Sequence, residues 1–149
     1  MPEDWSLVLA GSQGFDAAET LSLIADSPRA SQIRVTGYLT DEQLGQWYAR
    51  AAIFAFPSLD EGFGMPALEA MAAGVPVIAG NRSALPEVCG DAALLVDPQS
   101  EQELASALLL LAKDEDHCAD LVERGKRRAE QFKWETAVSA SLDVYREFL

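Results

Sequence analysis

The chain has 149 residues, of which 49% are hydrophobic and 23% are charged. It carries 11 Lys and Arg against 24 Asp and Glu, so its formal net charge is −13. This length suits one domain of ordinary size and is too short for two full α/β domains. Because non-specific binding of nucleic acid depends on Lys and Arg at the phosphates, the acid excess argues against a nucleic-acid partner.

Two further classes are disfavoured by simple patterns. No apolar run approaches the ~20 residues that span a bilayer, and the first residues lack the pattern of a signal peptide. Cys89 and Cys118 are far apart and His117 is the only histidine, so no disulfide framework and no metal site are expected. These patterns predict a cytoplasmic protein without a transmembrane segment.

Apolar runs and helix signals alternate along the chain. Strands are predicted at residues 5–10, 33–36, 52–57, 75–79 and 93–96. Helices are predicted between Asp16 and Pro28, and at about 40–50, 66–73, 100–111, 115–130 and 134–148. Asp16 with Glu19 and Thr40 with Gln43 are predicted capping pairs, and Ser100 with Glu103 starts a later helix.

This alternation indicates βαβ units, in which neighbouring strands are parallel. The third strand is apolar on both faces, as expected where helices cover both sides of a sheet. We therefore predict a Rossmann-like, doubly wound α/β fold with a mostly parallel sheet and a helical C-terminal end.

The segment after the third strand carries the predicted chemistry, because ligands of such sheets bind outside the carboxyl ends of the strands. It holds Gly62, Gly64, a helix start at Pro66, and two carboxylates, Glu61 and Glu69. Glycines let a ligand approach the backbone, and the N–H groups at a helix start favour a phosphate. Carboxylates accept hydrogen bonds from sugar hydroxyls. With Glu69 in the first helical turn, the segment predicts a sugar-nucleotide site.

These residues resemble a known family. The stretch Glu61-Gly-Phe-Gly-Met-Pro-Ala-Leu-Glu69 is similar to the E-x7-E signature of the retaining glycosyltransferases of family 4, the glycosyl transferases group 1. The flanks at 35–39, 51–58, 85–88 and 94–98 agree with it, and the similarity runs from about Leu7 to the end of the chain.

The resemblance implies a GT-B architecture, in which two Rossmann-like domains face each other across a cleft. Residues 1–149 are similar to its C-terminal half, the nucleotide-sugar (donor) binding domain. The family places an Arg and a Lys at the start of this domain, where they neutralise the departing diphosphate, but no basic residue precedes Leu7. We therefore expect a domain truncated at its N-terminus, without the acceptor-binding N-terminal domain and with little transferase activity alone.

The resemblance also implies roles for single residues. Glu61 is the implied catalytic residue, which contacts the donor sugar and stabilises an oxocarbenium-like transition state. The implied donor-binding residues are Glu69 at the ribose hydroxyls, Gly62, Phe63 and Gly64 at the diphosphate and sugar, Leu68 near the ribose, Val35 and Thr36 beside the base, and Gly11 close to the same site.

The implied reaction is retaining hexosyl transfer from a nucleotide diphosphate sugar to a glycan or glycolipid, with no cofactor and no metal. The form of 81–87 and 90–98 resembles mannosyltransferase-like members that act on surface polysaccharides. GDP-mannose is therefore the first donor expected, and UDP-glucose the second. The acceptor would bind through the missing N-terminal domain.

Other interpretations stay open at this point. Glu69 can simply complement a helix dipole, an effect of about 0.3–1 kcal/mol, and Glu61 can be a solvated loop acid. The chain can be a non-catalytic nucleotide-binding or scaffold module, or a sugar-nucleotide epimerase-like GT-B domain, although acid/base groups for an epimerase are not found. The 11–14 loop is no complete dinucleotide motif, and no acidic residue ends the second strand, which disfavours a dehydrogenase.

The C-terminal third adds two surface predictions. The basic cluster 124–128 and the lone His117 are expected on solvated helix faces, with peripheral contact of the cluster to the inner face of the membrane as the second interpretation. Trp134, Tyr145 and Phe148 lie at roughly helical spacing, which predicts a terminal helix. In the family that the chain resembles, this helix often crosses toward the N-terminal domain, so the resemblance implies that part of its apolar face is exposed here.

Overall fold

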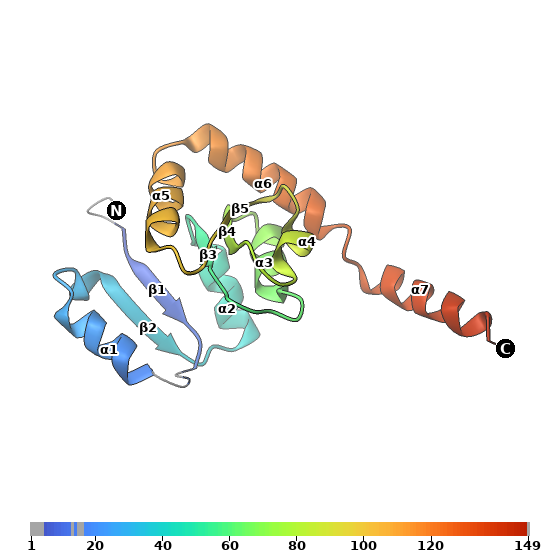
Figure 1. Cartoon of the computed structure of the whole chain (residues 1–149), viewed down its shortest axis with the longest axis horizontal. Coiled ribbons are helices and arrows are strands. Elements are labelled where there is room, and N and C mark those ends of the chain that lie inside the picture. The colour runs from blue at the N-terminus through green and yellow to red at the C-terminus, as the bar shows by residue number, and fades with distance from the viewer. Residues whose placement is uncertain (1–4, 13, 15–16, 149) are drawn as a thin grey trace. The chain divides into compact units, whose positions relative to one another are not determined.

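The computed structural model describes residues 5–12, 14 and 17–148 (Figure 1). The chain divides into two compact units, residues 1–50 and 51–149. No helix in the described ranges has the length and apolar character of a membrane span.

The first unit is a pair of parallel strands with their connecting helices. Its elements are β1 (Leu7–Ala10), α1 (Ala17–Asp26), the short 3-10 helix η1 (Ala30–Gln32), β2 (Ile33–Gly37) and α2 (Asp41–Tyr48). β1 pairs with β2 in parallel, with Leu7 opposite Ile33. The predicted cap of α2 is confirmed, because the Thr40 hydroxyl accepts from the Gln43 N–H and the Gln43 side chain accepts from the Thr40 N–H. The predicted cap at Asp16 lies outside the described residues.

The second unit is built on a three-stranded parallel sheet. Its elements are β3 (Phe54–Phe56), α3 (Met65–Ala72), β4 (Val77–Gly80), α4 (Leu85–Cys89), β5 (Ala93–Val96), α5 (Glu101–Leu111), α6 (Glu115–Ala129) and α7 (Trp134–Arg146). The strand order is β3-β4-β5, with Phe54 opposite Val77 and Val77 opposite Ala93. Ser100 caps α5 by accepting from the Glu103 N–H, as predicted.

All five predicted strands are present, most of them shorter than predicted. They form two separate parallel sheets within the described residues, one of two strands and one of three. The five-residue helix α4 was not predicted, because a segment so short shows no helical periodicity.

The core of the second unit lies around its central strand. Every residue of β4 is buried, and Ile78 packs in one cluster with Val96, Ala107, Leu111 and Leu121. α3 and α6 approach each other closely at Gly125, where an added Cβ would lie 3.1 Å from Cγ of Met71. This close packing anchors α3 and therefore the loop that leads into it.

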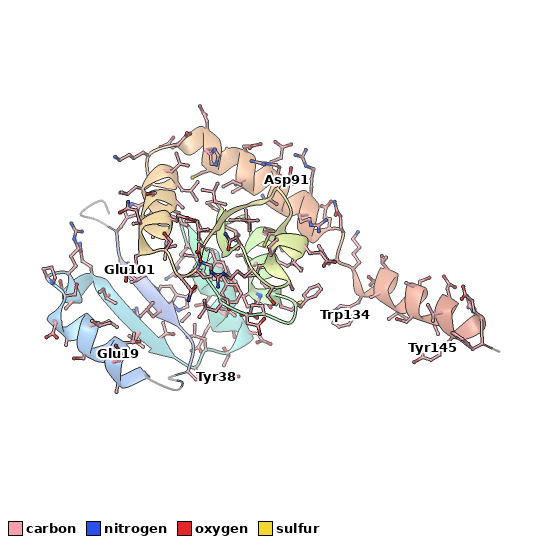
Figure 2. All side chains as sticks on the ribbon, in the orientation of Figure 1. Glu19, Tyr38, Asp91, Glu101, Trp134 and Tyr145 are labelled. Atoms are coloured by element: carbon pink, nitrogen blue, oxygen red, sulfur yellow. The ribbon has the colours of Figure 1, made fainter. Side chains whose placement is uncertain are left out.

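Helix α7 has no buried residue. Trp134 is 79% exposed and Tyr145 is 69% exposed, and both side chains project from the same side of the helix (Figure 2). The predicted exposure of an apolar face on the terminal helix is therefore confirmed.

Candidate functional site

The candidate site is the loop that joins β3 to α3. Pro66 stands in the first turn of α3, as predicted, because its ring fixes a helical φ where no N–H donor is needed. Gly64 caps the helix with a φ of 101°, and a Cβ at this position would lie 2.5 Å from Cδ2 of Leu85. Both the backbone angle and the contact require glycine here.

Three consecutive backbone N–H groups of this loop have no hydrogen-bond acceptor among the described residues. Within the described part of the chain, no hydrogen bond is formed by the N–H of Gly62, Phe63 or Gly64. Gly62 and Phe63 are exposed, whereas Gly64 is buried. A run of free N–H groups that ends at a helix N-terminus is a favourable place for an anion such as a diphosphate.

The carboxylates of Glu61 and Glu69 flank these three N–H groups along the chain. Glu61 is half-buried at the start of the loop, and Glu69 is exposed on α3. The expected position of Glu69 in the first helical turn is wrong: α3 already begins at Met65, and its first turn holds no acidic residue. A simple helix-dipole role for Glu69 is correspondingly weaker, because that effect falls off beyond the first turn. Leu68, beside it, is buried at 6% exposure.

A second loop, residues 81–84, lies against the start of the first. A Cβ at Gly80 would lie 2.5 Å from the carbonyl oxygen of Ser58, so the two backbones are in contact. Ser83 Oγ lies 2.7 Å from Asp60 Oδ1 and 2.7 Å from the Glu61 carbonyl oxygen. It also accepts from the Glu61 N–H at 3.3 Å. Sequence reasoning missed Ser83, because nothing local marks a serine that contacts a loop in another βα unit.

Phe63 holds the middle of the first loop from the other side. Its ring meets that of Phe132 edge-on, with centroids 5.7 Å apart, and the Arg128 guanidinium lies 4.9 Å from the Phe132 centroid. Arg128 donates to the carbonyls of Glu87 (2.6 Å) and Val88 (2.9 Å) near the end of α4. A cavity of about 500 Å³ lies among these groups.

The basic cluster 124–128 is therefore not a uniformly solvated helix face. Besides the contacts of Arg128, Arg124 donates to the Asp91 carbonyl at 2.6 Å and pairs with Asp120. His117 is half-buried, and its Nε2 is shielded from solvent without a hydrogen-bond partner among the described residues, so the predicted solvation holds only for part of the side chain. Helix packing decides the contacts of the two arginines, because it places Arg124 beside Asp91 and Arg128 beside the end of α4.

The predicted site residues of the first unit also come together. Gly11, with a φ of 130°, donates to the Gly37 carbonyl at 3.2 Å, and Val35 is opposite Leu9 in the sheet. The Thr36 hydroxyl donates to the Gly37 carbonyl at 2.9 Å. Val35 and Thr36 also line a cavity of about 410 Å³. These residues form the carboxyl end of the small parallel sheet.

Known proteins are similar to this chain in fold or in sequence. The sucrose-phosphate synthase of Thermosynechococcus elongatus matches with a TM-score of 0.85 at 29% identity, covering 96% of this chain and 38% of that one. HepE of Anabaena, in complex with UDP-glucose, matches with a TM-score of 0.85 at 22% identity, covering 99% of this chain and 42% of that one. The O-antigen chain mannosyltransferase B of Escherichia coli is 37% identical over 142 residues, which cover 95% of this chain and 37% of that protein.

The fold is thus that of one part of the GT-B glycosyltransferases, and the predicted parallel α/β class is confirmed. Residues 1–128 match the family described as "Glycosyl transferases group 1", and the chain belongs to this family. It spans 37% of the length of the Escherichia coli mannosyltransferase.

Proposed function

We propose that the 58–64 loop and the start of α3 bind a nucleotide diphosphate sugar. The observation that carries the proposal is the run of unused N–H groups at Gly62, Phe63 and Gly64, with Glu61 before it and Glu69 after it. In this arrangement the N–H groups hold the diphosphate, and Glu69 accepts from the ribose hydroxyls. Contacts of Leu68 with the ribose, of Val35 and Thr36 with the base, and of Gly11 nearby stay predictions.

The proposed reaction is hexosyl transfer with retention of anomeric configuration. The bond between the sugar C1 and the diphosphate oxygen breaks, and a bond between C1 and an acceptor hydroxyl oxygen forms on the same face. The proton of that hydroxyl moves to the leaving diphosphate. Glu61 stabilises the positive charge that develops at the sugar, because a fixed carboxylate favours such a charge in the transition state.

GDP-mannose is the proposed donor, with UDP-glucose second. The name of the Escherichia coli relative, a mannosyltransferase of the O-antigen chain, supports the first, and the UDP-glucose complex of HepE supports the second. A glycan or glycolipid acceptor would bind through a separate N-terminal domain, and residues 1–149 would act as the donor half in the cytoplasm, at the inner face of the membrane.

Calorimetric titration of the purified chain with GDP, UDP, ADP and their sugars tests the donor site. We expect one of the nucleotides to bind. Glu69→Ala should weaken binding of that nucleotide and of its nucleotide sugar by at least about tenfold, because hydrogen bonds to a charged group are lost. Glu135→Ala, on exposed α7, is the charge-matched control and should bind normally. Absence of binding by every nucleotide, or equal binding by Glu69→Ala, would overturn the proposal.

A further inference from the structure

Ser83 has an unusual backbone conformation for its residue type. Its φ is 56°, and it is the only non-glycine residue with a positive φ in the described part of the chain. A side chain at Cβ disfavours this left-handed region, so glycine would be more relaxed here. Strain of this kind is kept only where the surroundings enforce it, and it often marks functional sites.

The hydroxyl of Ser83 contacts both backbone polar groups of Glu61. It accepts from the Glu61 N–H at 3.3 Å and lies 2.7 Å from the Glu61 carbonyl oxygen. Its single proton is shared between that carbonyl and Asp60 Oδ1, also at 2.7 Å. One side chain thereby sets the orientation of the peptide units on both sides of Glu61.

Ser83 is itself held on both flanks. The Asn81 N–H donates to the Val96 carbonyl at 2.8 Å, and Arg82 donates to Asp97 and Gln99 at 3.1 Å each. On the other side, the fully buried Leu85 starts α4. The 81–84 loop is thus tied to the end of β5 and to the core, and it presents the hydroxyl from a fixed position.

We infer that Ser83 is a positioning residue, which orients Glu61 toward the sugar of the donor. The inference rests on the proposed function, since it needs a donor at the 58–64 loop. Ser83, Asp60 and their hydrogen bonds are exposed, so the hydroxyl contributes little to the hydrophobic core. The strained backbone of Ser83 is then explained by the hydrogen bonds through which its hydroxyl fixes the Glu61 backbone.

Two variants distinguish the effect of the backbone strain at Ser83 from the effect of its hydroxyl group. Ser83→Gly removes the hydroxyl and relieves the backbone, whereas Ser83→Ala removes the hydroxyl and keeps the unfavourable φ. We expect Ser83→Gly to melt at a higher temperature than Ser83→Ala. Both should weaken binding of the nucleotide sugar about threefold to tenfold, and binding of the nucleoside diphosphate by a clearly smaller factor. The diphosphate is affected less because only one of its three proposed donors, the Gly62 N–H, shares a peptide unit with the Glu61 carbonyl. Ser141→Ala, on exposed α7, is the control and should bind both ligands normally.

The readouts are thermal melting and calorimetry with GDP, GDP-mannose, UDP and UDP-glucose. A structural role alone would weaken both kinds of ligand in parallel with the loss of melting temperature. The inference is overturned if Ser83→Gly binds the nucleotide sugar as the wild type does, or if it loses the diphosphate equally. Failure of the proposed function is seen separately, because the wild-type chain would then bind none of these ligands.

Discussion

The ring of Phe132 meets the ring of Phe63 edge-on, with their planes at 85°. Phe63 belongs to the 58–64 loop, which joins β3 to α3, whereas Phe132 lies between α6 and α7. Because Arg128 stacks on Phe132 and binds the carbonyls of Glu87 and Val88, one group of contacts connects the 58–64 loop, α4 and the end of α6.

Loss of the Phe132 ring should loosen the 58–64 loop. We expect Phe132→Ala to lower the free energy of unfolding by about 1–3 kcal/mol, because the ring pair and the cation–π contact are both lost. Urea denaturation measures this change. Hydrogen exchange should become faster at the Ala67 amide, which donates to the Gly64 carbonyl at the end of this loop. Phe132→Leu keeps most of the apolar volume and should show a smaller effect, and equal effects would argue against a specific role of the ring.

The close contact of α3 with α6 should make Gly125 intolerant of a methyl group. Gly125→Ala places a Cβ 3.1 Å from Met71 Cγ and 3.3 Å from its Cβ. We expect a loss of about 1–3 kcal/mol in the free energy of unfolding. Gly45→Ala, at an exposed position of α2, is the matched control, since nothing lies within 4 Å of a Cβ added there. It should raise stability by about 0.5–1 kcal/mol. Chemical denaturation distinguishes the two, and the same sign for both would contradict this packing.

Substitution of Arg128 should lower the free energy of unfolding much more than substitution of its neighbour Arg127. Arg128→Met leaves the carbonyls of Glu87 and Val88 without their donor. We therefore expect the free energy of unfolding to fall by about 1.5–3 kcal/mol. Arg127 forms an exposed ion pair with Glu123 on the same helix, so Arg127→Met should change stability by at most about 0.5 kcal/mol. Guanidinium denaturation of the two variants tests this difference.

The buried thiol of Cys89 predicts a loss of stability at alkaline pH. Burial raises the pKa of Cys89 to about 11 from 9.0, and the positive charge of Arg128 offsets this only in part. Above pH 9 the unfolded chain loses this proton while the folded chain keeps it. Stability should therefore be full below pH 9 and fall between pH 9 and 11, by about 2–3 kcal/mol from this group.

Urea denaturation of the wild type and of Cys89→Ala between pH 7 and 10.5 measures this dependence. Other groups titrate in the same range, so the difference between the two proteins is the informative quantity. That difference should be constant below pH 9 and decrease above it. A difference that stays constant up to pH 10.5 would contradict the raised pKa of the thiol.

Much of the fold was predictable because its signals are local. Alternating apolar runs predicted all five strands, and the Thr40–Gln43 pair predicted its cap with both hydrogen bonds. Pro66 and the glycines predicted a loop that leads into a helix at the right place. Capping boxes, prolines and apolar runs act within a few residues, so their consequences can be read along the chain.

Other features depend on residues that are distant in the sequence. α4 is too short for a periodic pattern, and Ser83 is marked only by its φ and by its contacts with Asp60 and Glu61. Arg128 belonged to a cluster interpreted as a solvated face, although its guanidinium binds two carbonyls near the end of α4. A long side chain on a helix has no local rule for its partner, because neighbouring elements supply it.

The sequence by itself determined the parallel α/β class, the loop that carries the two glutamates, and the family to which the chain belongs. Only the tertiary structure decided that Glu69 lies beyond the first turn of α3, and that Ser83 and Phe63 are the residues through which other elements hold the loop. The physical reason is range: periodicity and caps act within a few residues, whereas packing and hydrogen bonds across loops join residues that are far apart in the sequence.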